Sequence, residues 1–366
     1  MTADCGVKTW AQYQAQPRFL ELDGYRGLGV MLVIGQHMRT QVVGWTNPYG
    51  AMTVFFLVSG FIITTLALRE ERARGALSLR AFYVRRALRI LPSYYCVLGA
   101  YCLLIFGLGV GAEKAEALRK LLGPYLLYYQ EFPFFLASRF GVGDWQNIPF
   151  YQSWSLGIEE KFYLLWPVLG FVWLRGGGLW RFVAALALGI GFACAPAALG
   201  QVGEVVFPYW NILAGCALAV LLDDERAYRK LAVLARPGVG AIVLALALGV
   251  HLLGAWHESI RYVHPPAMAI GMIVLLLADG PVQRVLRTRP AVFLGSISYG
   301  IYLVHLFGIN IAEAVLPSID RGTLAAILTF ALAIACTVLG AWLLHIVVER
   351  PCVALARRWS RRLAGR

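Results

Sequence analysis

Residues 51–68 read AMTVFFLVSGFIITTLAL, an unbroken apolar stretch without a charged side chain. A helix that crosses the hydrocarbon core of a bilayer needs about 20 mostly apolar residues. Stretches of this kind recur along the whole chain, which has 366 residues, 59% of them hydrophobic and only 14% charged. A soluble domain carries about 25% charged residues. The composition therefore predicts an all-α integral membrane protein.

We predict about ten transmembrane helices packed in one bundle. A transmembrane domain would cover 26–347, between a cytoplasmic N-terminal segment, 1–25, and a basic cytoplasmic tail, 348–366. The expected spans are 26–44, 51–69, 88–110, 152–174, 181–200, 206–222, 238–256, 262–279, 291–312 and 322–347. A further apolar stretch, 121–137, is interrupted by prolines, Gln130 and Glu131.

The positive charges decide whether 121–137 crosses the membrane. The formal net charge is +13, and lysine and arginine collect in cytoplasmic loops of membrane proteins. If 121–137 does not cross and the N-terminus is cytoplasmic, most arginines lie inside; if it crosses, the arginine-rich tail lies outside. The charges therefore predict a multi-pass protein of the inner (plasma) membrane, with both termini cytoplasmic and 121–137 re-entrant or interfacial.

The outer connection, 111–151, is rich in tyrosine, phenylalanine and tryptophan. Two interpretations stay open for these side chains. They could form the aromatic belt at the membrane interface, or they could offer a surface on which a sugar ring stacks. No motif or basic–aromatic run indicates a nucleic-acid partner.

Charged residues inside spanning helices are costly and are functional candidates. Arg26 and His37 are eleven residues apart, which is three helical turns plus about 20°, so they share one face about 16 Å apart along the axis. Asp23 lies on the same face and could hold the Arg26 guanidinium. The alternative is a snorkelling arginine with a hydrogen-bonded core histidine.

A second group of cations opens the third predicted helix. Arg85, Arg86 and Arg89 lie at its cytoplasmic end, and Arg86 and Arg89 share a face. Two guanidinium groups on one face can grip a phosphate. Ordinary positive-inside anchoring would explain the same residues.

Two further helices carry polar groups at depth. Glu159 and Glu160 lie in SWSLGIEEKFYLLWP, beside Lys161, and a structural ion pair is the plain alternative to a functional role. His305 ends the stretch ISYGIYLVH, with Tyr302 one turn earlier; a core histidine bonded to a tyrosine or a carbonyl would look the same. His251, His257 and His264 have no ligand spacing, so we predict no metal site.

These segments together resemble the membrane-bound acyltransferase 3 family, which includes O-antigen and exopolysaccharide O-acetyltransferases. The resemblance covers most of the chain, in order. The similar segments are LDGYRGLGVMLVIGQH with its arginine–histidine spacing, VFFLVSGFIIT, LRAFYVRRALRILPSYY with its Arg-x-x-Arg pair, SWSLGIEEKFYLLWP, ISYGIYLVH and the closing VERP. Departures are Tyr25 in place of a common leucine and Lys161 in place of a common glutamine.

The resemblance implies transfer of an acyl group, typically acetyl from acetyl-CoA, to a hydroxyl of a carbohydrate or another acceptor. Coenzyme A is a polyanion, so Arg26, Arg86 and Arg89, with Arg85, would bind its phosphates at the cytoplasmic face. His37 would be the general base.

Four further residues would support the reaction. Glu159 would orient His37, with Glu160 beside it, and Tyr302 or His305 would donate to the thioester oxyanion. Both a direct attack and a route through an acyl-enzyme stay open.

Other functions also fit a bundle with buried charges. A transporter or flippase for an envelope glycan precursor is the main alternative, and a non-catalytic scaffold ranks behind it. The acceptor could also be a lipid or a macrolide. Membrane lipids are expected neighbours in every case.

Overall fold

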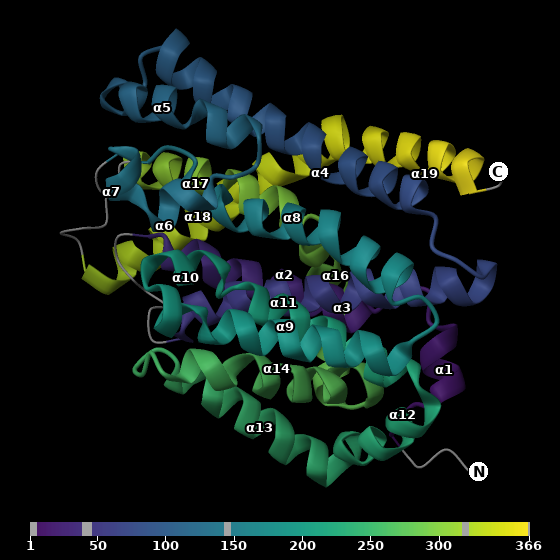
Figure 1. Cartoon of the computed structure of the whole chain (residues 1–366). Helices are drawn as coiled ribbons and strands as arrows, with labels where there is room; N and C mark the ends of the chain where they lie inside the picture. The colour runs from purple at the N-terminus through teal and green to yellow at the C-terminus, as the bar shows by residue number, and fades with distance from the viewer. Residues whose placement is uncertain (1–5, 39–45, 143–147, 317–321, 365–366) are drawn as a thin grey trace. The chain divides into compact units, whose positions relative to one another are not determined.

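The computed structural model describes residues 6–38, 46–142, 148–316 and 322–364, and within these ranges the chain is helical, without a β-strand (Figure 1). An isolated antiparallel bridge joins Val7 to Ala278. In chain order the elements are α1 Trp10–Ala15, α2 Leu20–Gln36, α3 Pro48–Arg74, α4 Leu79–Cys102, η2 Leu103–Gly107, η3 Ala112–Lys114, α5 Ala115–Leu126, α6 Glu131–Phe135, α7 Ala137–Phe140, η5 Tyr151–Ser153, α8 Trp154–Val168, η6 Leu169–Trp173, α9 Gly178–Leu199, α10 Gln201–Val206, α11 Tyr209–Asp223, α12 Glu225–Leu231, η7 Ala232–Ala235, α13 Pro237–Leu253, α14 Ile260–Leu277, α15 Pro281–Leu286, α16 Arg289–Ser296, α17 Ser298–Val315, α18 Gly322–Leu344, η8 His345–Glu349 and α19 Arg350–Ala364.

Within the described ranges, six helices are long and apolar enough to cross a membrane, and two bent helix pairs raise the number to eight. The six are Gly50–Arg74, Leu79–Gly107, Gly178–Leu199, Gln201–Asp223, Ile260–Leu277 and Gly322–Leu363. The pairs are Glu225–Ala235 with Pro237–Leu253 and Arg289–Ser296 with Ser298–Val315. The chain is thus an all-α, multi-pass membrane protein, and the number ten stays a prediction.

The two remaining predicted spans correspond to α2 and α8. Both carry charged side chains, α2 near its start and α8 at Glu159, Glu160 and Lys161. The predicted bounds 26–44 are wrong for the first helix, because α2 covers Leu20–Gln36 and His37 is its C-terminal cap. Residues 39–44 of that prediction lie outside the described ranges.

The stretch 121–137 contains no helix long enough to span. It is divided among the end of α5, the five-residue α6 and the start of α7. Tyr128, between α5 and α6, has a φ of +56°, a left-handed conformation that interrupts a right-handed helix. This agrees with the predicted non-spanning character of the stretch.

The chain divides into two compact units. The first contains 1–68, 178–186 and 211–342, and the second contains 69–177, 187–210 and 343–366.

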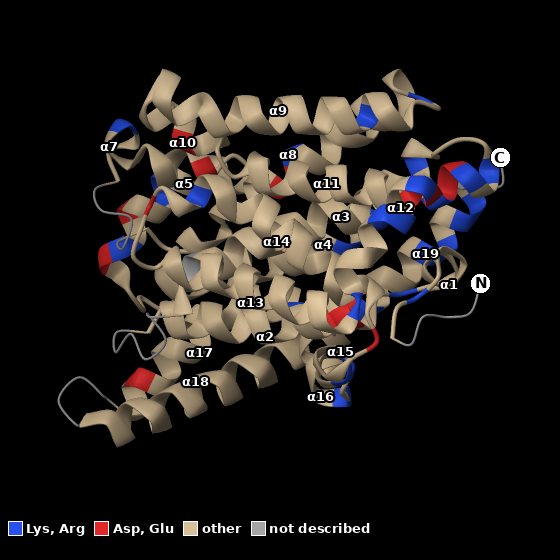
Figure 2. Ribbon diagram, turned by 90° about the horizontal axis from the view of Figure 1, so that it is seen from below, with Lys and Arg blue, Asp and Glu red and all other residues tan. Residues whose placement is uncertain are grey.

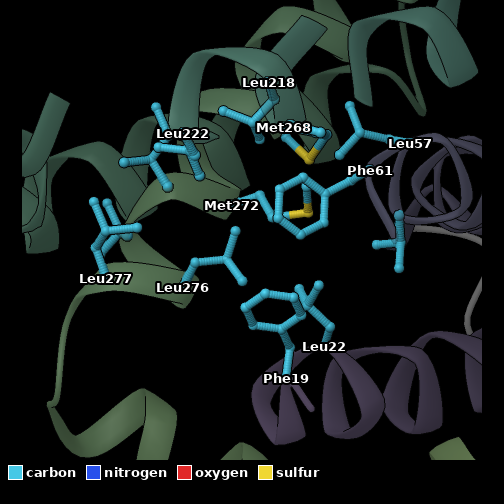
Figure 3. Packing of buried hydrophobic residues seen from close by; sticks show 14 of the residues in the cluster. Phe19, Leu22, Leu57, Phe61, Leu218, Leu222, Met268, Met272, Leu276 and Leu277 are labelled. Carbon is cyan, nitrogen blue, oxygen red and sulfur yellow. The ribbon is translucent and has the colours of Figure 1, made fainter. Parts of the chain in front are cut away.

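The first unit has an apolar core contributed by α2, α3, α11 and α14 (Figure 3). Phe61 of α3 lies among Met268 and Met272 of α14, and Phe19 and Leu22 approach from the start of α2 (Figure 3). Phe61 and Leu22 are fully buried. This packing fixes the N-terminal end of α2 within the unit.

Close backbone contacts also hold α2 against α15 and α16. A Cβ at Gly295 would lie 1.8 Å from the carbonyl oxygen of Asp23, and one at Gly24 would lie 1.9 Å from that of Leu286. Only hydrogen fits at these two positions, because real Cβ contacts below 3.0 Å are essentially unknown. The two glycines thereby set the position of α2 against the chain that leads into α17.

The predicted span 291–312 is not one continuous helix. The chain bends by 79° between α16 and α17. The Ser296 hydroxyl donates to the carbonyl oxygen of Phe293 at 2.7 Å, a local bond that competes with helix continuation. His305 therefore cannot be placed by counting residues along one axis.

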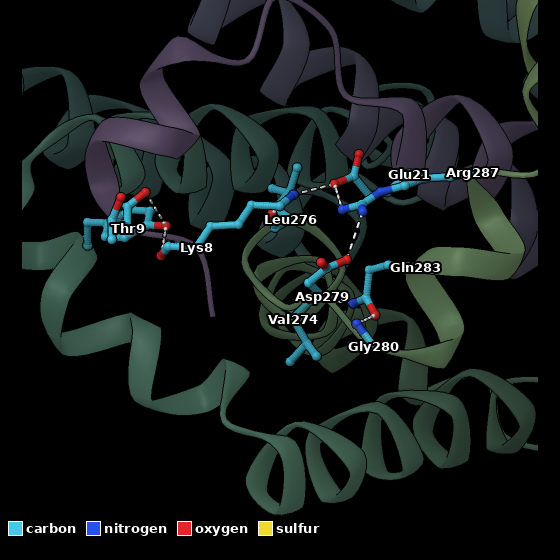
Figure 4. A network of polar contacts seen from close by, with 10 residues as sticks. Lys8, Thr9, Glu21, Val274, Leu276, Asp279, Gly280, Gln283 and Arg287 are labelled. Atoms are coloured by element: carbon cyan, nitrogen blue, oxygen red, sulfur yellow. Dashed lines mark hydrogen bonds and ion pairs between the residues drawn. The ribbon is translucent and has the colours of Figure 1, made fainter. Parts of the chain in front are cut away.

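A charged network ties the N-terminal segment to the α14–α15 connection (Figure 4). The buried Glu21 carboxylate is bound by Lys8 and by Arg287, whose Nη2 lies 2.8 Å from Oε1. Arg287 also reaches Asp279 at 2.8 Å, and Lys8 donates to the carbonyl oxygen of Leu276. Two cations thus neutralise one buried carboxylate.

The second unit is organised around α4. The basic helix α19 packs beside it, and Figure 2 shows the contrast between α18, which is free of charge, and the arginines that follow it. The Tyr83 hydroxyl donates to the carbonyl oxygen of Leu164 in α8 at 2.8 Å. The Tyr94 and Tyr95 hydroxyls donate to the carbonyl oxygens of Tyr125 and Leu126 at the end of α5.

Candidate functional site

In the first unit, the fold brings His37 and His305 together. Their ring centroids lie 4.7 Å apart in an edge-to-face arrangement. His37 caps the end of α2, and His305 lies inside α17, where it is fully buried. The sequence singled out both histidines, but it did not predict that they touch.

Each ring is oriented by a hydrogen bond to its own helix. His37 Nδ1 lies 2.8 Å from the carbonyl oxygen of Val33, and His305 Nδ1 lies 2.7 Å from that of Tyr302. A carbonyl oxygen only accepts, so the hydrogen must be on Nδ1 in both rings. In the neutral form each Nε2 then carries the lone pair, which is the tautomer a general base needs.

The two histidines differ in their surroundings. His37 is half-buried, whereas His305 is fully buried and its Nε2 lacks a hydrogen-bond partner among the described residues. With hydrogen on Nδ1, His305 could donate to an oxyanion only as an imidazolium. The Tyr302 ring packs against His305 with centroids 5.7 Å apart.

Asp23 has an ion-pair partner in the chain before α2. Its Oδ2 lies 2.5 Å from Nε of Arg18. The guanidinium carbon of Arg26 lies 6.0 Å from the centroid of the Phe55 ring. That Asp23 could also hold the Arg26 guanidinium stays a prediction.

In the second unit, Arg86 lies between two aromatic rings. Its guanidinium carbon is 5.8 Å from the centroid of Phe82 and 5.4 Å from that of Tyr163. Tyr163 is in α8, so this contact joins α8 to α4. A guanidinium stacked on ring faces keeps its N–H edges for an anion.

The three arginines of α4 are not equivalent. Arg85 Nη2 lies 2.7 Å from Oε2 of Glu70, so its charge is already balanced. Arg89 is exposed, and no carboxylate pairs with it in the part of the chain that the structure describes. Arg86 and Arg89 are therefore the better candidates for binding a phosphate.

The charged residues of α8 also have different partners. Glu160 lies within electrostatic range of Arg86 and Glu159. Lys161, which adjoins both glutamates in the sequence, turns instead to Glu131 of α6, with Nζ 2.5 Å from Oε1. The predicted orientation of His37 by Glu159 stays a prediction, because the two residues belong to different units.

Sequence reasoning missed two polar clusters. In the sequence, Glu131 only interrupts an apolar stretch, whereas in the structure it is the buried partner of Lys161. His251 and His264 lie 3.1 Å apart between ring nitrogens, and His264 also bonds Thr53. His251 and His264 are 13 residues apart in the sequence, on two helices joined by a turn. This separation matches neither a helical repeat nor a metal-ligand spacing, so the sequence does not indicate that the two rings touch.

The aromatic residues of the outer connection pack on one another. Tyr125 and Phe150 are buried, with ring centroids 5.6 Å apart, and Tyr94 of α4 joins both Phe150 and Tyr128. This part of the aromatic set is neither an interfacial belt nor an open stacking surface.

The chain matches known proteins over most of its length. A family model described as an acyltransferase domain matches residues 19–346. The peptidoglycan O-acetyltransferase OatA of Listeria monocytogenes is 26% identical over 352 residues, which are 85% of this chain and 53% of that protein. The putative peptidoglycan O-acetyltransferase YrhL of Bacillus subtilis is 26% identical over 314 residues, covering 78% and 47%.

A putative O-acetyltransferase of Staphylococcus aureus is 27% identical over 174 residues, covering 44% of this chain and 26% of that protein. The chain spans about half the length of the first two relatives. No solved structure matches it.

Proposed function

Because the chain belongs to the acyltransferase family whose domain matches residues 19–346, we propose that it transfers an acyl group, acetyl in the first instance, from acyl-CoA to a carbohydrate hydroxyl. The acceptor class is a glycan or glycoconjugate of the cell envelope, and the peptidoglycan O-acetyltransferases among its relatives support this choice.

The observation that carries the chemistry is the pair of oriented imidazoles. His37 has its hydrogen on Nδ1, bound to the Val33 carbonyl oxygen, and the lone pair on Nε2. His37 Nε2 removes the proton of the acceptor hydroxyl as its oxygen bonds to the thioester carbonyl carbon. The C–S bond then breaks, and the proton passes to the departing sulfur of coenzyme A, so the base is restored.

His305 supports His37 rather than acting on the substrate. It is fully buried in contact with the ring of His37, and its Nδ1 bond to the Tyr302 carbonyl oxygen holds it in one orientation. The oxyanion donor role then falls to the Tyr302 hydroxyl. This division follows from the tautomer, because neutral His305 has no hydrogen on Nε2 to donate.

The donor would be held by its phosphates. Arg86 and Arg89, one turn apart on α4 in the second unit, offer a fork of N–H donors. Arg85 contributes less, because Glu70 already neutralises it. Binding the donor from the cytoplasmic side agrees with the predicted topology.

The test is a transfer assay with the purified full chain, [¹⁴C]acetyl-CoA and peptidoglycan glycan strands. We expect alkali-labile radiolabel on the glycan and stoichiometric release of coenzyme A. Arg89→Gln should raise KM for acetyl-CoA about tenfold, by the loss of one charge-assisted hydrogen bond. Arg229→Gln, which removes an exposed arginine paired with Glu225, is the matched control. Absence of labelled glycan and of coenzyme A release with the unmodified chain would contradict the proposal.

A further inference from the structure

The non-spanning segment between α5 and α8 contains a buried polar cluster in the second unit. Glu131 and Gln130 are 1% and 3% exposed. Lys161 Nζ reaches three oxygens, namely Glu131 Oε1 at 2.5 Å and the carbonyl oxygens of Tyr128 at 2.5 Å and Gly157 at 3.2 Å. An ammonium group has three donors, so these acceptors satisfy Lys161 completely.

Two acceptor oxygens in this cluster are left over. Glu131 Oε2 and Gln130 Oε1 are buried and have no hydrogen-bond partner in the described part of the chain. The Gln130 amide nitrogen is used, because it donates to the carbonyl oxygen of Ser153 at 2.9 Å, and this bond fixes which side of the amide carries the oxygen. A buried acceptor without a donor is destabilising, and such groups in native proteins require an explanation.

The backbone around the cluster is held in an unusual conformation. Tyr128 and Phe150 have φ values of +56° and +60°, and only a few percent of residues other than glycine adopt positive φ. Both contribute carbonyl oxygens to the cluster, Tyr128 to Lys161 and Phe150 to the Ser153 hydroxyl. Strain of this kind persists where the surrounding structure enforces it, commonly at binding sites.

The chemistry of the missing partner follows from the two oxygens. A carboxylate oxygen and an amide oxygen only accept hydrogen bonds, so the partner must supply two donors. No group of three potential metal ligands occurs among the described residues, which favours hydroxyl donors over a cation. In the same connection, Trp154 of α8 stacks on Phe134 of α6 with ring centroids 5.2 Å apart at 9°.

We propose that Gln130 Oε1 and Glu131 Oε2 form a subsite that accepts hydrogen bonds from two hydroxyl groups of the carbohydrate acceptor. The inference deepens the proposed function, since it assigns the acceptor to the α5–α8 connection. Glu131 Oε2 lies against Gly157 of α8, where a Cβ would approach it to 2.1 Å, so admission of the sugar requires the five-residue helix α6 to move away from α8. Lys161 is a positioning residue, because it fixes the carboxylate through Oε1 and leaves Oε2 for the ligand.

The experiment measures saccharide binding without an acyl donor, so its result does not depend on catalysis. The purified full chain in detergent is titrated with chitotetraose, a hydroxyl-rich tetrasaccharide, and with its permethylated derivative, which has no O–H donors. We expect the unmodified chain to bind chitotetraose and to bind the permethylated derivative at least tenfold more weakly.

Gln130→Met is the main variant, because it removes the neutral acceptor and leaves the Glu131–Lys161 pair intact. We expect the Kd for chitotetraose to rise about 3- to 10-fold, because the variant loses one hydrogen bond to the sugar. Glu131→Asp keeps the charge but shortens the side chain by one methylene group, which moves the carboxylate away from the sugar. This variant should raise the Kd for chitotetraose about tenfold. Gln283→Met is the matched control: it makes the same change at a buried glutamine of the first unit, whose amide nitrogen donates to the carbonyl oxygen of Val274 at 2.8 Å, so Kd should not change.

Three results would overturn the subsite. These are no binding of chitotetraose by the unmodified chain, equal binding of the permethylated sugar, or a Gln130→Met variant that melts at a lower temperature with unchanged Kd. The last result would mean that only water fills the two acceptors. Failure of acyl transfer with intact chitotetraose binding would instead contradict the proposed function and leave the subsite standing.

Discussion

At the scale of single residues, the candidate chemistry depends on two imidazoles in contact, His37 at the end of α2 and His305 inside α17. The spacing of Arg26 and His37 placed them on one face of a helix, and that reasoning needs only the period of 3.6 residues. The contact of His37 with His305 depends on how α2 packs against α17, and the partner of Asp23 depends on the chain before α2. Neither is a local property, so neither could be predicted from spacing.

His305 offers a direct test of the positioning role. In His305→Gln the side chain can still fill the space beside His37, but it loses the imidazole face. We expect kcat for acyl transfer to fall about 10- to 100-fold with KM for acetyl-CoA unchanged, because misplacing a base acts on the transition state. The pH profile of kcat, measured on the same variant, should keep the shape of the parent profile. If kcat of this variant no longer falls at high pH as it does in the parent, His305 itself exchanges the proton.

Glu21 gives a prediction for stability against pH. It lies in the predicted cytoplasmic segment 1–25. Burial alone would raise its pKa, but the hydrogen bonds from Lys8 and Arg287 outweigh burial, and the pKa lies below the ordinary value of 4.5. A lowered carboxyl pKa contributes stability that is present above about pH 4.5 and is lost as the pH falls through the folded-state pKa.

The melting temperature of the chain in detergent should therefore fall as the pH drops below about 4.5. Glu21→Gln should melt lower than the parent at neutral pH and should lose this part of the dependence. Glu225→Gln removes an exposed carboxylate and should retain the parental profile. A parental profile in Glu21→Gln would show that the network does not contribute.

At the scale of elements, hydropathy located most spans because it is read from each segment alone. It was least reliable for α2 and α8, whose charged residues shorten the apolar stretch. The bend between α16 and α17 was not visible, since Ser296 and the residues around it read as apolar helix. The same holds for 121–137, where the charge count identified a non-spanning stretch but not its helices.

The crossing of α2 and α16 gives a prediction at this scale. Gly295→Ala places a methyl group against the Asp23 carbonyl oxygen, so the helices must separate. We expect a loss of about 1–3 kcal/mol in the free energy of unfolding, the usual cost of overpacking, and reduced transfer activity because α2 carries His37. Gly191→Ala in α9, where a Cβ has no neighbour within 4 Å, should be neutral or stabilising by up to about 1 kcal/mol. Equal melting temperatures for the two variants would refute the tight crossing.

At the scale of the whole molecule, the distribution of arginines determines the predicted topology. Green fluorescent protein fused to the C-terminus of the full chain should fluoresce, since it folds in the cytoplasm. An epitope inserted between Gly111 and Ala112, at the start of the outer connection, should be reached by antibody from outside intact spheroplasts. This pair of results requires an odd number of crossings between the epitope and the C-terminus, as the ten-span prediction has it. A dark fusion or a shielded epitope would contradict that topology.

The central claim is that His37 is the base of an acyl transfer, and its most direct test is the rate constant for [¹⁴C]acetyl transfer by His37→Ala. The control is His257→Ala, which changes an exposed histidine, and binding of acetyl-CoA is measured on both variants. We predict that His37→Ala binds acetyl-CoA normally and loses about 10²- to 10⁴-fold in kcat, while His257→Ala stays at the parental rate. A His37→Ala variant that transfers acetyl at the parental rate would contradict the account.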